Sequence, residues 1–168
     1  MKKIGLLLIF AVLIIILFFS FFKSNGKNKD NKPKNKKIQK IENIKSMNFS
    51  YSTSTEKDSN VRYEIIKEND KYFAIIKLNN MPDESEKKIE IAENFVNNVI
   101  EILNKYNVYS WNKFNKSDSN VLDGTGFYFS LLMENNKTIK ASGYEIYPKN
   151  YGYVRGSLDE IFENLYNE

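Results

Sequence analysis

The 168-residue chain contains no cysteine and no histidine. The absence of cysteine excludes disulfide bonds, thiol catalysis and a lipid anchor on an acylated cysteine. The absence of histidine removes the most common general base and the most common ligand of transition metals. Catalysis would then need a Ser–Lys pair or a carboxylate pair, and neither stands out in the sequence.

The chain also lacks the glycine-rich loop that cradles phosphates. Asp118, Asn120 and Asp123 place oxygen atoms in one segment. The alternating ligands and the terminal bidentate glutamate of an EF-hand are missing there, so we interpret Asp123-Gly124 as a turn. We therefore expect no catalytic residues, no cofactor and no metal.

A long apolar run stands near the N-terminus. Residues 4–22 are nineteen consecutive residues without a charge. As a helix rising about 1.5 Å per residue, they would nearly cross the roughly 30 Å of a bilayer core. Lys2 and Lys3 precede the run as in a signal peptide, but it is longer than a signal h-region and residues 24–26 are a poor cleavage site. We predict an uncleaved, single-pass transmembrane anchor within residues 1–22.

The charge of the chain is divided unevenly. Residues 1–45 hold eleven lysines and two acidic residues, a net charge of +9, whereas the other 123 residues carry −5. The acidic domain does not suit nucleic acid, which needs a clustered positive face. We interpret residues 23–45, rich in lysine and asparagine, as a flexible linker. It would be a solvated spacer or a contact for anionic lipid headgroups, gaining roughly 1 kcal/mol per lysine near the surface.

The two flanks of the apolar run conflict over orientation. Eight lysines follow it between residues 23 and 40, and the positive-inside rule would place them, and the domain, in the cytoplasm. A very short N-terminus with paired lysines instead resembles an exported signal-anchor protein. We predict an extracytoplasmic domain and keep the cytoplasmic alternative open.

The rest of the chain predicts a small α+β domain over residues 46–168. Alternating apolar residues predict five strands, at residues 47–54, 61–68, 72–78, 127–133 and 138–147. Apolar residues three and four positions apart predict two helices, one over residues 83–107 and a short one capped by Ser157. We expect an antiparallel sheet of about five strands, in the order three strands, helix, two strands, helix, with both helices packed on one face.

Local signals support these elements. Asn69-Asp70 is typical of a two-residue hairpin turn, because both residues tolerate positive φ. Asp83 with Glu86 three residues later resembles a capping box at the start of the long helix. Gly143 inside a strand indicates a bulge or a close approach of backbone.

Aromatic and turn residues gather at two places in the C-terminal half. We interpret them as a candidate interaction surface, made of Trp111, Asn112, Phe114, Asp123, Tyr144, Tyr147 and Tyr151. An exposed shelf of tryptophan and tyrosine would stack on a sugar or a peptide. The same aromatic residues would equally fill the end of a small core. The two arginines, Arg62 and Arg155, could clamp a carboxylate or phosphate, or form structural ion pairs at the surface.

Several short motifs follow one another along the chain in an order that resembles that of a known group of domains. They are Trp111-Asn112-Lys113-Phe114, Asp123-Gly124-x-Gly126-Phe127, Ala141-Ser142-Gly143-Tyr144, Pro148-x-Asn150-Tyr151 and Leu158…Ile161-Phe162. This order resembles small domains, without an established activity, of membrane-anchored proteins and lipoproteins from Gram-positive-type bacteria. The resemblance covers about residues 60–168 and implies an external location. It implies no active site, and this chain lacks the cysteine of the lipoprotein members.

These observations favour a non-catalytic interaction domain held at the membrane. Its partner would be another envelope protein or a wall polymer. An alternative is a self-protection or inhibitor protein, whose acidic domain binds a basic hydrolase or toxin. Two further alternatives are a hydrolase with an unrecognised site and an accessory subunit whose anchor helix is itself the contact.

Overall fold

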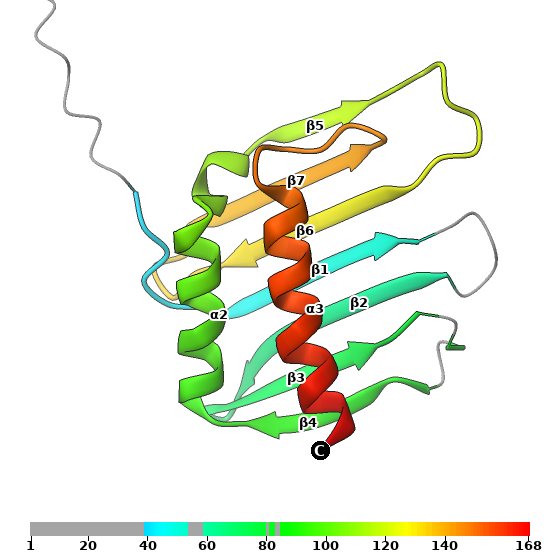
Figure 1. Cartoon of the computed structure of the whole chain (residues 1–168). Helices are drawn as coiled ribbons and strands as arrows, with labels where there is room; N and C mark the ends of the chain where they lie inside the picture. The colour runs from blue at the N-terminus through cyan, green and yellow to red at the C-terminus, as the bar shows by residue number, and fades with distance from the viewer. Residues whose placement is uncertain (1–38, 54–58, 80, 83–84) are drawn as a thin grey trace, which may run out of the picture. The chain divides into compact units, whose positions relative to one another are not determined.

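Two helices lie across one face of a seven-stranded sheet (Figure 1). The computed structural model describes residues 39–53, 59–79, 81–82 and 85–168, and the compact unit comprises Gln39–Glu168. The predicted α+β class and the two predicted helices are confirmed. The predicted anchor lies outside the described residues. Within the described part of the chain, no helix has the length and apolar character needed to cross a bilayer.

The sheet is mixed and not wholly antiparallel as expected. Its strand order is β4-β3-β2-β1-β6-β7-β5, and all neighbours are antiparallel except β5, which runs parallel to β7. The elements in chain order are β1 (Ser46–Ser52), β2 (Asn60–Glu68), β3 (Lys71–Lys77), β4 (Lys87–Ile91), α2 (Glu93–Lys105), the 3-10 helix η2 (Val108–Trp111), β5 (Phe114–Ser117), β6 (Gly126–Leu132), β7 (Thr138–Tyr144) and α3 (Tyr151–Asn167).

Two strands were missing from the prediction of about five. The segment Lys87–Ile91 was predicted as helix, but it pairs with β3 as the edge strand β4, and α2 begins only at Glu93. Ile89 shares a helical stripe with Ala92, but together with Ile91 it also fits the two-residue period of a strand. The adjacent lysines are typical of a protected sheet edge. The predicted capping box is wrong, because Glu86 pairs with Arg62 instead of folding back on a helix start. Asp83 lies outside the described residues.

The second missing strand, β5, has four residues and only one that is apolar. Its pairing with β7 is parallel and depends on the chain returning from α2, which no local pattern reveals. Helix α3 is also longer than predicted, because it begins at Tyr151 and contains Ser157 in its interior. Gly152 and Gly156 lower the helix propensity of this segment, so the sequence did not predict the first turns of α3.

The core lies between the helices and the face of the sheet that they cover. Alternate residues of β1 and β2 point into it, and the helices add Val96, Val99, Leu103, Val154, Leu158 and Phe162. Tyr63 stacks on Phe162 with ring centroids 4.6 Å apart. Ile41 and Ile44, within the segment predicted as linker, are 1% and 0% exposed and join this core. The predicted hairpin turn is confirmed, with Asn69 and Asp70 at φ 50° and 62°.

Candidate functional site

The aromatic residues singled out in the sequence form one cluster around Phe127. The ring centroids of Trp111, Phe114, Tyr147 and Tyr151 lie between 4.8 and 6.2 Å from that of Phe127. Trp111 is 1% exposed, and its Nε1 donates a hydrogen bond to the Lys149 carbonyl at 3.0 Å. This cluster is therefore an extension of the core, and Trp111 offers no surface to a ligand.

The remaining predicted residues lie away from that cluster. Asn112 is exposed, and its Oδ1 accepts a hydrogen bond from the Lys140 amide at 3.3 Å. Asp123 is exposed on the segment that joins β5 to β6. Tyr144 is half-buried at the end of β7, where its hydroxyl reaches that same segment. The structure thus brings Tyr144 and Asp123 to one place, which is the connection between β5 and β6.

This connection, residues 118–125, is called the 118–125 loop below. The Tyr144 hydroxyl accepts a hydrogen bond from the Gly124 amide at 2.6 Å and donates one to the Leu122 carbonyl at 2.9 Å. The Glu145 carboxylate accepts hydrogen bonds from the amide and the hydroxyl of Thr125. The Tyr147 hydroxyl donates to the Thr125 carbonyl at 3.1 Å. Three side chains at the end of β7 and just after it therefore hold the C-terminal half of the loop.

The N-terminal half of the loop is fixed by Asp118. Its amide donates to the Tyr144 carbonyl at 3.0 Å, and its Oδ1 accepts hydrogen bonds from the amide and the side chain of Asn120. Between these two fixed halves, Leu122 is 90% exposed. A large apolar side chain is thus presented to solvent by a loop whose own backbone is held in place.

The face of the sheet opposite the helices carries an open hollow of about 530 Å³. Its lining comes chiefly from β1, β2 and β6, with the side chains of Ser50, Ser52, Asn60, Arg62, Lys77 and Tyr128. Sequence reasoning missed this site except for Arg62. A sequence pattern that could have indicated the hollow is the small polar residues at alternate positions of β1. They lie on the other face of the strand from the apolar residues that predicted it.

Arg62 is the charged centre of that face. Its Nε lies 3.3 Å from Glu64 Oε1, and its guanidinium also pairs with Glu86. In the strand register Arg62 stands opposite both Ser50 on β1 and Lys77 on β3. Lys77 is 3% exposed, so Arg62 supplies the cationic surface of the hollow.

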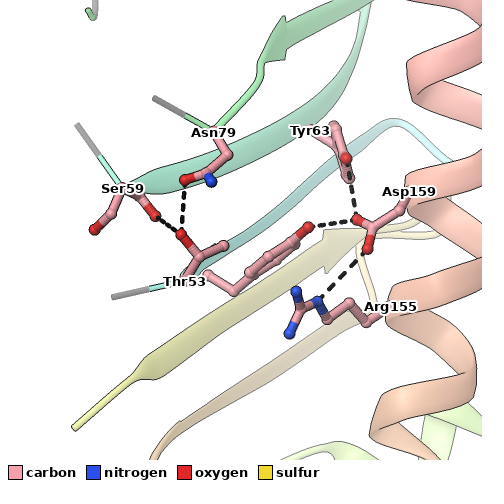
Figure 2. Close-up of polar contacts among 7 residues, drawn as sticks. Thr53, Ser59, Tyr63, Asn79, Arg155 and Asp159 are labelled. Carbon is pink, nitrogen blue, oxygen red and sulfur yellow. Dashed lines mark hydrogen bonds and ion pairs between the residues drawn. The ribbon is translucent and has the colours of Figure 1, made fainter. Parts of the chain in front are cut away.

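A second polar group lies on the helix side of the sheet, as Figure 2 shows. Asp159 of α3 accepts hydrogen bonds from the hydroxyls of Tyr51 at 2.6 Å and Tyr63 at 3.0 Å. Arg155 Nε lies 3.5 Å from the other carboxylate oxygen, and the guanidinium stands over the Tyr51 ring. Burial, followed by the contact with Asp159, raises the pKa of Tyr51 far above its usual range. Burial likewise raises the pKa of Tyr63.

Both tyrosines therefore remain protonated donors near neutral pH, which suits a structural clamp and not a proton acceptor. Beside this clamp, Thr53 Oγ1 lies 2.9 Å from the Ser59 carbonyl and 2.6 Å from Asn79 Oδ1 (Figure 2). These contacts join the ends of β1, β2 and β3. Among the described residues no three acidic side chains come close enough to hold a metal ion.

Comparison of the chain with protein-family models and with curated protein sequences found no match. Within the described residues, the surface features best suited to binding are the 118–125 loop and the hollow.

Proposed function

We propose that this protein is a non-catalytic binding domain, held at the membrane by residues 4–22 and displayed outside it, which recognises a protein partner through the 118–125 loop. The observation that carries the proposal is Leu122, which is 90% exposed on a loop that Tyr144, Glu145 and Tyr147 hold in place. The proposal keeps Asp123 and Tyr144 in the site and assigns Trp111 to the core.

The free energy gained by burying Leu122 favours its contact with a partner. Burial of one leucine side chain stabilises a complex by roughly 1.5–3 kcal/mol. Because hydrogen bonds already fix the loop backbone, little conformational entropy is lost when a partner encloses the tip. Few residues carry most of the energy of an interface. Tryptophan, tyrosine and arginine are the most frequent among them, and each such anchor fills a well-packed pocket from which water is excluded. Leu122 is in a position to be such an anchor.

The charge around the tip indicates the chemistry of the partner. Asp118 and Asp123 flank Leu122 in the loop, and Glu145 lies against Thr125 at its base. A pocket that accepts Leu122 would therefore carry cationic groups on its rim. This acidity, with the charge of −5 on residues 46–168, supports the second candidate, an inhibitor or self-protection protein for a basic hydrolase or toxin. A steep fall of the association rate with added salt would favour that candidate over a largely apolar contact.

Site-specific photo-crosslinking in living cells tests the proposal. A photo-crosslinking amino acid would replace Leu122 in one strain and Tyr153 in another. Tyr153 is the matched control, because it is 68% exposed on α3, which covers the helix face of the sheet. We expect a discrete adduct from position 122 and none from position 153.

Two substitutions separate recognition from folding. Leu122→Ser should abolish the adduct formed by a crosslinker at position 123, with thermal stability unchanged because the side chain is solvated. Tyr144→Phe should weaken capture by freeing the Leu122 carbonyl and the Gly124 amide. Equal adducts at positions 122 and 153, or an adduct at 123 that survives Leu122→Ser, would reject the loop as the contact.

A further inference from the structure

On the uncovered face of the sheet, the floor of the hollow is a strip of small residues between two large side chains, Arg62 and Tyr128. On this face β1 contributes the small residues Ser50 and Ser52, and Gly126 adds no side chain. In the register Ser50 lies opposite Arg62 on one side and opposite Tyr128 on the other. Since neighbouring strands are about 4.8 Å apart, Arg62 and Tyr128 stand about 10 Å apart across the strip. That width suits one ring of a small molecule.

The lining combines a flat ring with groups that donate and accept hydrogen bonds. Tyr128 is 44% exposed and lines the hollow, so part of its side chain is accessible to a ligand there. The structure gives the hydroxyls of Ser50 and Tyr128 no partner within the described residues. Arg62 is held in position by Glu64 and Glu86, so that its remaining N–H groups are oriented in advance. A sugar ring matches this set, because it has one C–H face and a rim of hydroxyls.

Other ligand classes fit the hollow less well. An extended peptide binds by adding to a sheet edge, whereas the backbone groups beneath this hollow are already paired between β2, β1 and β6. Arg62 and Lys77 are balanced by Glu64 and Glu86, so these described side chains supply no surplus positive charge for a phosphate or a polyanion. A wholly apolar ligand would strip water from the serine and arginine groups without replacing their hydrogen bonds.

From this geometry we infer that the hollow binds a neutral oligosaccharide, with one sugar ring against Tyr128 and its hydroxyls bonded to Ser50, Asn60 and Arg62. The hollow volume lies within the range of small-ligand sites. The inference does not depend on the 118–125 loop, so each site can fail without the other. Together they would give the domain one site for glycan and one for protein.

The test is an NMR titration of the full chain in a detergent that has no sugar headgroup. The neutral probes are cellotetraose and the tetramer of N-acetylglucosamine, and an oligogalacturonate is the anionic probe. We expect a neutral probe to shift the amide signals of Ser50, Ser52 and Gly126. Tyr128→Ala should weaken binding by about tenfold or more, whereas Tyr128→Phe should stay within about threefold because the ring remains. Tyr153→Ala and Leu122→Ser should leave the affinity unchanged.

Three results would overturn the inference. The first is the absence of shifts around the hollow with both neutral probes at millimolar concentration. The second is tighter binding of the oligogalacturonate than of either neutral probe, which would make the ligand an anion. The third is an affinity for the neutral probe that Tyr128→Ala does not change.

Discussion

Asp159 joins one helix to two strands through a single carboxylate. The hydroxyls of Tyr51 and Tyr63, from β1 and β2, both donate to its Oδ1, and Arg155 one turn earlier on α3 approaches its Oδ2. Hydrogen bonds to a charged group contribute about 1.5–3 kcal/mol, more than those between neutral groups. This group of Asp159, Arg155 and the two tyrosines, called the Asp159 clamp, is a polar part of a largely apolar contact between helix and sheet. A second polar contact is made at the end of α3, where the Lys87 ammonium donates a hydrogen bond to the Tyr166 carbonyl at 2.7 Å.

Tyr63→Phe should lower the free energy of unfolding by about 1–2 kcal/mol, because it removes one hydrogen bond and keeps the ring that stacks on Phe162. Urea unfolding followed by circular dichroism would measure the change. Tyr128→Phe, an exposed tyrosine on the other face, is the matched control and should shift the value by less than about 0.5 kcal/mol. Equal stability of Tyr63→Phe and the wild type would show that the clamp contributes nothing.

The same residues predict a loss of stability in alkali. The pKa values of Tyr51 and Tyr63 are raised in the folded state, whereas unfolded tyrosine ionises near pH 10. Above about pH 10 the folded state therefore binds more protons than the unfolded state, and the free energy of unfolding falls as the pH rises. The double variant Tyr51→Phe/Tyr63→Phe should show a shallower fall between about pH 10 and pH 11.5. Parallel curves for variant and wild type would contradict this assignment.

Two glycines should respond oppositely to alanine. At Gly143 a Cβ atom would lie 2.1 Å from the Ile146 carbonyl oxygen and 2.6 Å from the Phe127 ring, which bears out the predicted close approach. Gly143→Ala should therefore cost about 1–3 kcal/mol or more. At Gly156, inside α3, an added Cβ atom would meet nothing within 4 Å apart from its chain neighbours and the backbone of its own helix. Gly156→Ala should therefore raise stability by about 0.5–1 kcal/mol. Differential scanning calorimetry gives both signs, and the same sign for both would refute the packing described.

At the scale of elements, α2 begins without a capping side chain. Its N-cap residue is Ala92, which has extended backbone angles and forms no side-chain hydrogen bond to the helix. Ala92→Asp should accept a hydrogen bond from the first turn and raise the free energy of unfolding by about 1 kcal/mol. Ala92→Lys, which offers no acceptor, is the control. If both variants have the same stability in urea, the helix start is not limited by its cap.

Elements whose patterns are local could be predicted from the sequence. β1, β2 and β3 follow from period-two alternation and the Asn69-Asp70 turn, and α2 follows from its apolar stripe. β4 could not be predicted in this way, because Ile89 fits both a helical stripe with Ala92 and a strand period with Ile91, and only the pairing with β3 decides between them. β5 could not be predicted either, because its four residues have almost no apolar pattern and are extended through their pairing with β7.

The site was predicted only in part, for a related reason. The sequence shows that aromatic residues gather near Trp111, but it does not show which elements cover them. In the structure Trp111 is buried, and residues of α3 such as Tyr151 lie against it. No sequence pattern distinguishes Leu122 or Tyr128, because single apolar residues at a surface are common. Their significance comes from the backbone anchors around Leu122 and from the register that places Tyr128 beside Ser50.

For the whole molecule, the N-terminal 45 residues and the rest of the sequence carry opposite net charge. Residues 1–45 carry +9 and residues 46–168 carry −5, so the basic charge lies beside the predicted anchor and the acidic charge on the folded unit. A domain tethered in this way would have a high local concentration near any partner in the same membrane. Both proposed sites, for a protein and for a neutral glycan, suit a domain displayed in the envelope.

The central claim, a binding domain displayed outside the membrane, is tested most directly by trypsin treatment of intact cells whose wall has been removed. The segment between residues 23 and 40 holds eight lysines, so an external linker would be cut. The account predicts that the folded domain is released into the medium without lysis, while a cytoplasmic marker stays intact. Protection of the chain until the cells are lysed would place the domain in the cytoplasm and contradict the account.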